Sequence, residues 1–127
     1  MAITEGLRGA AELRVGAEDT AAALGSGDVD VLGTPRALAL AEAATVDTVA
    51  AHLAEGQTTV GTEVALSHLA ASPVGAEVRA EARLRQVDGR RLVFDVTLAH
   101  ADGRVVARGT VERVAVDRAR FTANARP

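Results

Sequence analysis

Residues 31–42, which read VLGTPRALALAE, decide the fold of this chain. Thr34 is suited to N-cap a helix, because its hydroxyl can accept hydrogen bonds from the free N–H groups of the first turn. Pro35 then takes the first helical position, where a missing N–H has no consequence. The pattern predicts a helix that runs to about Ala54, where Gly56 ends it. No other stretch has a helical pattern of this length, so the remaining elements must pack around it.

Glu42 interrupts the apolar face of this predicted helix. The face repeats at helical spacing and consists of Leu38, Glu42, Thr45, Val46, Val49 and Leu53. A glutamate on the buried side of a helix loses hydration, so its carboxylate must be paired, hydrogen-bonded or protonated, and such groups gather at functional sites. The alternative is that the face turns slightly and Glu42 reaches water at its edge. Glu42 is therefore a candidate functional residue.

Alternating patterns predict strands on both sides of the helix. A short strand over 10–15 comes first, followed by a helical turn over 18–24 that Gly25 ends. After the helix, four segments read as strands: 58–69, 78–87, 91–100 and 105–116. Asp-Gly pairs at 88–89 and 102–103 close hairpins, so we expect these four strands to follow one another as an antiparallel meander. This order is typical of an α+β domain in which sheet and helix share one core.

Two of the strands have clearly separated faces. In strand 78–87 the alternation places apolar residues inward and charged residues outward, with Val78, Ala80, Ala82 and Leu84 on the inner face. Strand 91–100 places Leu92, Phe94, Val96 and Leu98 on one face. These residues are the predicted wall of the core.

His68 ends the apolar face of strand 58–69, which the alternation predicts to consist of Val60, Thr62, Val64, Leu66 and His68. Because Glu42 projects from the helix face that meets the sheet, both side chains point into the same layer. Thr34 lies roughly 12 Å before Glu42 along the helix axis, so a substrate rather than direct contact would link them. A hydroxyl, a carboxylate and an imidazole near one cleft can supply nucleophile, base and proton shuttle for acyl transfer. Taken singly, Thr34 is explained as an N-cap and His68 as a hydrogen-bonded histidine at a strand end.

The composition narrows the class of protein. The chain has 127 residues, which suits a single domain over 1–127, and no cysteine, which excludes thiolate nucleophiles and cysteine metal sites. Its net charge is −3 and its basic residues are all arginine, scattered among acids, so nucleic acid is not an expected partner. No export signal or membrane-spanning stretch is visible, so we expect a cytoplasmic protein without a membrane partner. We expect no metal, and place His52 and His100 at the surface or a sheet edge.

The motifs of the chain resemble one family. They are VLGTP (31–35) with Glu42, VGTEV (60–64), SH (67–68), ASPVG (71–75), VDGRRL (87–92) and GTVER (109–113). In these motifs, and in the spacing from Thr34 to Glu42 to His68, the chain resembles the hot-dog thioesterases related to the fluoroacetyl-CoA thioesterase over nearly its whole length. The resemblance implies an α+β hot-dog fold, in which an antiparallel sheet wraps one long central helix.

The same resemblance implies an enzyme that hydrolyses an acyl-CoA thioester to the acid and free CoA, with Thr34, Glu42 and His68 as its catalytic set. Glu42 would be the nucleophile or the base for water, Thr34 would position it or stabilise charge, and His68 would move a proton to the leaving thiolate. Gly61 and Arg113 would contact substrate or CoA. The resemblance implies no cofactor beyond the CoA of the substrate, and a homodimer, with a tetramer left open.

The chain departs from this family at the acyl pocket. In the fluoroacetate enzyme a pair of aromatic residues before the helix gates the pocket, whereas residues 24–29 here read LGSGDV. Val111 also stands where the family has a histidine before its Glu-Arg pair. We therefore expect small or medium acyl groups rather than fluoroacetyl selectivity.

Alternatives to this interpretation stay open. An acyl carrier protein can carry the acyl group in place of CoA, and the chain can be a non-catalytic acyl-CoA binding protein that keeps the fold and pocket. An enoyl-CoA hydratase is disfavoured, because no Asp/His pair lies near the helix start. Arg79, Arg83 and Arg85 are candidates for binding CoA phosphates, but outward arginines that alternate along a strand are also typical of a solvated face.

Overall fold

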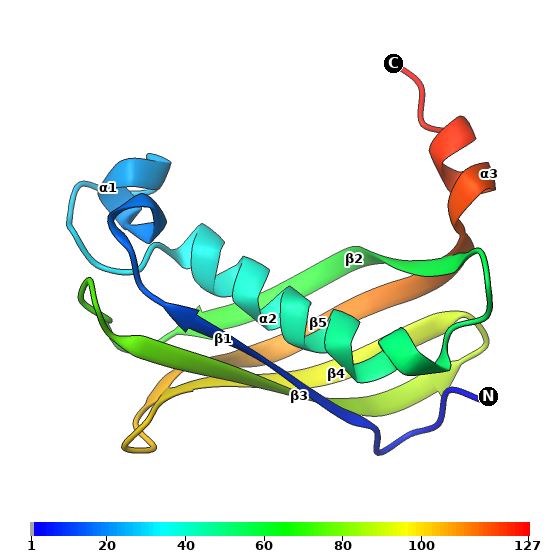
Figure 1. Cartoon of the computed structure of the whole chain (residues 1–127), viewed down its shortest axis with the longest axis horizontal. Helices are drawn as coiled ribbons and strands as arrows, with labels where there is room; N and C mark the ends of the chain where they lie inside the picture. The colour runs from blue at the N-terminus through cyan, green and yellow to red at the C-terminus, as the bar shows by residue number, and fades with distance from the viewer. Residues whose placement is uncertain (1) are drawn as a thin grey trace.

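The structure is a five-stranded antiparallel sheet that curls around one long helix (Figure 1). It is a computed structural model and describes residues 2–127. The strands are β1 (Arg8–Arg14), β2 (Gln57–His68), β3 (Glu77–Asp88), β4 (Arg91–His100) and β5 (Val105–Asp117). The helical elements are η1 (Ala17–Asp19), α1 (Ala21–Leu24), α2 (Thr34–Val49), η2 (Ala50–His52) and α3 (Arg118–Ala123). The predicted α+β class, with one long helix inside an antiparallel sheet, is confirmed.

Helix α2 begins one residue earlier than the sequence predicts. Gly33 is the N-cap, with extended backbone at φ −74° and ψ 144°, and Thr34 is already the first helical residue, so Pro35 takes the second position. The prediction that Thr34 caps the helix is wrong, because its hydroxyl is hydrogen-bonded to a histidine ring in place of the first-turn N–H groups. The α-helix ends at Val49, before the predicted end, and a 3₁₀ turn completes it.

The buried face of α2 is rotated relative to the predicted face. It consists of Ala37, Leu40, Ala41, Ala44, Thr45, Thr48 and Val49, whereas Val46 is 45% exposed. These mostly small residues let the helix approach β1 closely: a Cβ on Gly9 would lie 2.4 Å from the backbone nitrogen of Thr48. The rotation places Glu42 at the edge of the buried face, half-buried, which is the alternative that the sequence left open.

The order of strands in the sheet is β1-β3-β4-β5-β2, so the predicted four-strand meander is wrong. Only β3, β4 and β5 form a meander, and β2 lies at the far edge, paired with β5. The connection after β2 explains this. Its end is hydrogen-bonded to the end of β1, because the Val15 N–H donates to the Ala76 carbonyl at 2.9 Å and the Gly75 N–H to the Val15 carbonyl at 2.7 Å. Strand β3 therefore starts beside β1.

A β-bulge in β2 changes which side chains face the helix. The pairing of β2 with β5 shifts by one residue between Gly61 and Glu63, which leaves Thr62 as an extra residue. The inner row is therefore Thr59, Gly61, Val64, Leu66 and His68, opposite Ala115, Arg113, Val111, Gly109 and Ala107 of β5. The predicted single face is correct from Val64 to His68 and wrong before the bulge, because alternation assumes a regular strand.

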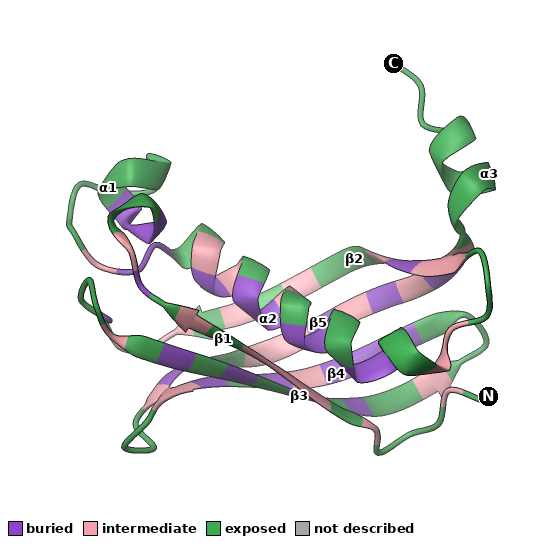
Figure 2. Ribbon diagram, viewed as in Figure 1, coloured by how far each residue is buried: buried purple, intermediate pink, exposed green. Residues whose placement is uncertain are grey.

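Strands β3 and β4 supply the core as predicted. Figure 2 shows buried and exposed residues alternating along β3, where Val78, Ala80, Ala82 and Leu84 are buried. The predicted inner residues of β4 are also buried, and Phe94 at 0% exposure is the largest of the core side chains. Since α2 packs mainly on β1 and β3, the inner row of β2 remains only partly covered.

Candidate active site

Thr34 and His68 form a direct pair. The Thr34 hydroxyl lies 2.8 Å from Nδ1 of His68, which joins the first residue of α2 to the last residue of β2. The other ring nitrogen of His68, Nε2, is buried and has no hydrogen-bond partner within residues 2–127. One ring nitrogen of a neutral imidazole donates and the other accepts, and the Thr34 hydroxyl can serve Nδ1 in either role. This arrangement leaves Nε2 to give or take a proton.

Backbone hydrogen bonds hold the start of α2 in place for this pair. The Leu32 N–H donates to the Ser72 carbonyl at 2.8 Å, and the Gly33 N–H donates to the Asp19 carbonyl at 2.9 Å. The Asp19 side chain is also tied down, because it accepts from the Arg36 guanidinium at 3.1 Å. Sequence reasoning missed Asp19, whose role depends on a contact across the fold that no local pattern signals.

Glu42 belongs to a second cluster, with Gly61 and Arg113. The Arg113 guanidinium donates from Nη1 to Oε2 of Glu42 at 3.0 Å, an ion pair in which the Arg113 side chain is 8% exposed and that of Glu42 32%. Gly61 lies directly under this carboxylate, since a Cβ there would approach Oε2 to 2.4 Å. The carboxylate thus occupies the space that any larger residue at Gly61 would fill.

Thr59 completes the second cluster, and sequence reasoning missed it. Nε of Arg113 donates to the Thr59 hydroxyl at 2.9 Å, and Nη2 donates to the Thr59 carbonyl at 3.1 Å. Regular alternation places Thr59 on the outer face of β2, and only the bulge at Thr62 brings it inward. An unpredicted bulge therefore hid the residue.

The bulge itself is held from the outer face of the sheet. The Thr62 hydroxyl donates to Oε2 of Glu112 at 2.7 Å, and Arg91 is paired with the same carboxylate. These hydrogen bonds, that from Thr62 first and that from Arg91 second, hold the pKa of Glu112 below its usual value. Glu112 neighbours Arg113 on β5, so the outer contacts and the inner cluster share one short segment.

The structure therefore divides the predicted catalytic residues between two clusters. Thr34 and His68 meet at one end of α2, and Glu42 lies eight residues further on, with Gly61 and Arg113. A groove of about 340 Å³ opens beside the first pair, between the segment before α2 and the residues after β2. Its polar lining residues are Asp28, His68 and the hydroxyls of Ser26 and Thr34, and the rest are aliphatic or small, with no Phe, Tyr or Trp: Ala21, Gly27, Val29, Val31, Leu32, Leu69, Ala70 and Ala71.

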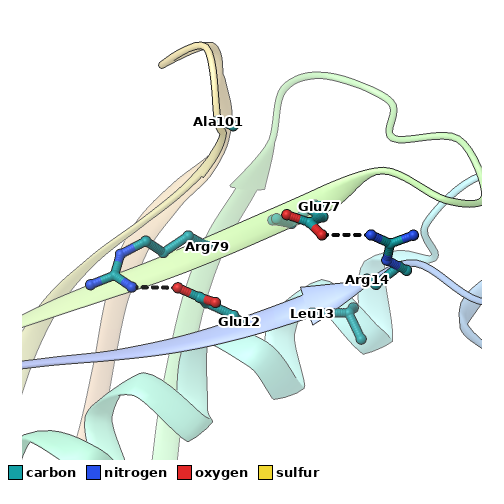
Figure 3. A pocket seen from close by; sticks show the side chains of 7 residues that line it. Glu12, Leu13, Arg14, Glu77, Arg79 and Ala101 are labelled. Atoms are coloured by element: carbon teal, nitrogen blue, oxygen red, sulfur yellow. Dashed lines mark hydrogen bonds and ion pairs between the residues drawn. The ribbon is translucent and has the colours of Figure 1, made fainter.

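The outward arginines lie on the opposite face of the sheet from Glu42. Figure 3 shows Arg79 paired with Glu12, at 2.7 Å, and Arg14 paired with Glu77. Arg85 lies 3.5 Å from Asp95. A charged outer face is thus present, and a role for these arginines toward CoA phosphates stays a prediction.

The remaining predicted features can also be located. His100 is half-buried, with Nε2 2.7 Å from the Ser72 hydroxyl, and His52 is half-buried after α2. Within residues 2–127 no group of three or more His, Asp or Glu side chains could hold a metal ion. None of the described helices combines the length and the apolar character that crossing a membrane requires.

Comparisons with known proteins identify the family. The model of the family described as fluoroacetyl-CoA-specific thioesterase matches residues 15–119. The fluoroacetyl-CoA thioesterase of Streptantibioticus cattleyicolor is 36% identical over 97 residues, which are 76% of this chain and 69% of that protein. These matches confirm the predicted family and its class of reaction, thioester hydrolysis.

Solved structures agree with this assignment. A structure of the fluoroacetyl-CoA thioesterase FlK superposes with a TM-score of 0.88 and 29% identity, covering 97% of this chain and 95% of that one. A hypothetical protein of Thermus thermophilus, described as a thioesterase superfamily member, gives a TM-score of 0.88 and 28% identity, covering 96% and 90% of the two chains. The hot-dog fold is thereby confirmed. With its sequence, its fold and its spacing of motifs in agreement, the chain belongs to the fluoroacetyl-CoA-specific thioesterase family.

Proposed function

We propose that this protein hydrolyses small or medium acyl-CoA thioesters, with Thr34, Glu42 and His68 as catalytic residues. The observation that carries the proposal is the environment of the Glu42 side chain. Its carboxylate is paired with the buried guanidinium of Arg113, lies over a glycine, and remains partly open to solvent. A carboxylate held in this way is oriented and still accessible, as a nucleophile or a base for water requires.

The chemistry follows from the two clusters. Glu42 attacks the acyl carbonyl, or takes a proton from the water that attacks it, and the carbon–sulfur bond of the thioester breaks. His68 delivers a proton from Nε2 to the departing thiolate, while its Nδ1 remains bonded to the Thr34 hydroxyl. If Glu42 attacks directly, water then hydrolyses the acyl anhydride. In both routes the proton given up by the attacking water replaces the one that His68 lost, so that one water is consumed and the acid and free CoA are released. No cofactor takes part.

The position of Gly61 supports a role beside the substrate. Its Cα lies next to the carboxylate on the inner row of β2, and the absence of a side chain leaves the space that the Glu42 carboxylate occupies beside the strand backbone. Arg113 lies within the same cluster, so a thioester bound near Glu42 also comes near this cation. We therefore keep both residues in the proposed site. Gly61 would lie beside the thioester, and Arg113 would contact Glu42 and the substrate.

The groove beside Thr34 and His68 supports the proposed acyl preference. Aliphatic and small side chains, without an aromatic gate, suit an unbranched or branched alkyl group. The relatives act, by their names, on fluoroacetyl-CoA. For this chain we propose a broader preference for small and medium acyl groups, with an acyl carrier protein as the alternative carrier.

A homodimer is part of the proposal. Strand β2 is an edge strand of 12 residues, and long edge strands expose backbone groups that a second copy can pair. Leu69 at its end is 57% exposed and Val46 on α2 is 45% exposed, so apolar surface flanks this edge. Light scattering of the purified protein distinguishes a dimer from a monomer or a tetramer. We place the enzyme in the cytoplasm, without nucleic acid or membrane as partner.

Free-thiol release from a panel of acyl-CoA esters tests the function. The panel is run with the unmodified protein, with Glu42→Ala and with Glu63→Ala, a control that removes an exposed carboxylate from strand β2. We expect release that Glu42→Ala lowers to a small residual rate and Glu63→Ala preserves. No release from any ester, together with a CoA-induced rise in melting temperature, would instead indicate a binding protein. Loss of enoyl thioester absorbance without free thiol would indicate a hydratase.

A further inference from the structure

We propose that Thr59 is a positioning residue of this active site. It fixes the guanidinium of Arg113, which in turn holds the carboxylate of Glu42 where the thioester is attacked. This inference rests on the proposed function, because it assigns the reacting carboxylate to Glu42. Within residues 2–127 Thr59 is not hydrogen-bonded to Glu42 and does not line the proposed acyl groove, so its effect must pass through Arg113.

Thr59 accepts two of the three hydrogen bonds that the Arg113 guanidinium makes within the described chain. Its hydroxyl accepts from Nε at 2.9 Å and its carbonyl accepts from Nη2 at 3.1 Å, while Glu42 accepts from Nη1 at 3.0 Å. Each of the three guanidinium nitrogens therefore donates one hydrogen bond, and acceptors on two sides fix the plane of the group. A planar, forked donor held in this way has one orientation.

Burial makes these bonds necessary. Arg113 is 7% exposed and Thr59 is 9% exposed, so water cannot readily replace the Thr59 hydroxyl as the acceptor for Nε. A buried donor that loses its partner carries the full cost of its desolvation, and the guanidinium would turn or shift to recover an acceptor. Among residues 2–127, Glu42 is the only charged group bonded to the Arg113 guanidinium. A shift of the guanidinium therefore acts directly on the Glu42 carboxylate.

Three elements meet through this network. Thr59 comes from β2, Arg113 from β5 and Glu42 from α2, and the bonded residues lie 54 and 71 positions apart in the sequence. The sheet pairing alone places Arg113 opposite Gly61, two residues from Thr59 on the same inner row. The network therefore ties the helix that carries Glu42 to the far edge of the sheet, where its contacts with β2 are few.

The test compares Thr59→Val with Thr59→Ser in thiol-release kinetics. Valine keeps the shape of threonine and removes the hydroxyl acceptor, whereas serine keeps the acceptor. We expect kcat to fall about tenfold in Thr59→Val with KM within about twofold, since the loss concerns a group that acts only in the transition state. Thr59→Ser should recover most of kcat. Thr97→Val on the exposed face of β4 is the matched control and should behave as the unmodified protein.

Further measurements separate this inference from its alternatives. If Thr59→Val unfolds, the Thr59→Ser and Arg113→Lys variants carry the test, because lysine keeps the charge but lacks the forked geometry and should lower kcat in the same way. A kcat for Thr59→Val equal to that of the unmodified protein would overturn the inference. So would equal losses in the valine and serine variants, or a change confined to KM. Absence of thiol release from the unmodified protein would refute the proposed function itself.

Discussion

Replacing Gly61 with alanine tests the geometry of the candidate active site most directly. The added Cβ would lie 2.4 Å from Oε2 of Glu42 and 3.5 Å from Nη1 of Arg113. Ordinary contact begins near 3.4 Å, so the carboxylate must move by about 1 Å, whereas the guanidinium is already at a tolerable distance. A displacement of about 1 Å in a reacting group can cost about 100-fold in rate. We therefore expect kcat to fall about 100-fold in Gly61→Ala.

The same substitution should barely change stability. The atom that must move is the end of a flexible side chain that is 32% exposed, so it can swing toward solvent without disturbing the backbone. Alanine is also favoured over glycine in a strand by roughly 0.5–1 kcal/mol, which offsets part of the weakened ion pair. We expect the free energy of unfolding to change by about 1 kcal/mol or less, a shift of about 4 °C in melting temperature. Gly61→Ala should therefore lower activity strongly while leaving stability nearly unchanged.

Thiol release and urea denaturation, measured on the same preparations, check both halves of this prediction. The decisive control is a double-mutant cycle: in a Glu42→Ala background, Gly61→Ala should leave the residual rate unchanged, because its target is already absent. An unchanged kcat in Gly61→Ala would refute the reasoning. An equal further loss in the Glu42→Ala background would show that Gly61 acts on the substrate independently of Glu42.

Three further substitutions test other parts of the structure. Thr34→Val should slow thiol release at least tenfold by removing the hydroxyl from the imidazole, yet leave the melting temperature unchanged; a loss of about 1 kcal/mol would instead indicate a helix cap. Gly109→Ala should destabilise the protein by about 3 kcal/mol or more in urea denaturation, because its Cβ would meet a neighbouring strand's rigid backbone carbonyl. Glu112, whose pKa is lowered by hydrogen bonds from Thr62 and Arg91, contributes stability that is present above its unfolded pKa and lost as pH falls through its folded pKa. The stability difference between the unmodified protein and Glu112→Gln, measured by urea denaturation from neutral to acid pH, should therefore shrink in acid; a constant difference would contradict this assignment.

Local patterns were enough to predict most of the elements. The segments expected as strands coincide with β2 to β5 to within one residue at either end, because alternation and Asp-Gly turns depend on a few neighbouring positions. The inner faces of β3 and β4 were predicted for the same reason. The predicted start of α2 was wrong by one residue, because the Thr34 hydroxyl is hydrogen-bonded to a histidine 34 positions away and does not cap the helix.

The candidate site was predicted in composition but not in arrangement. Thr34 and Glu42 were expected not to touch, and they lie in separate clusters, but the hydrogen bond between Thr34 and His68 was not predicted. The family resemblance predicted Arg113 as a substrate contact. Its ion pair with Glu42 was not predicted and is seen only in the structure. Spacing along the chain does not encode which residues of different elements share a hydrogen bond.

The sequence by itself determined the α+β class, the long helix, the hairpins and the residue types of the site, because hydrophobic periodicity and turn chemistry act locally. Only the tertiary structure decided the edge position of β2, the bulge at Thr62 and the inward side of Thr59. Pairing between β2 and β5 joins residues about 40 to 60 positions apart, and its register depends on the whole sheet. A one-residue shift in that register exchanges the two faces of the strand. The position of the Glu42 carboxylate, over Gly61 and beside Arg113, therefore depends on the folded sheet.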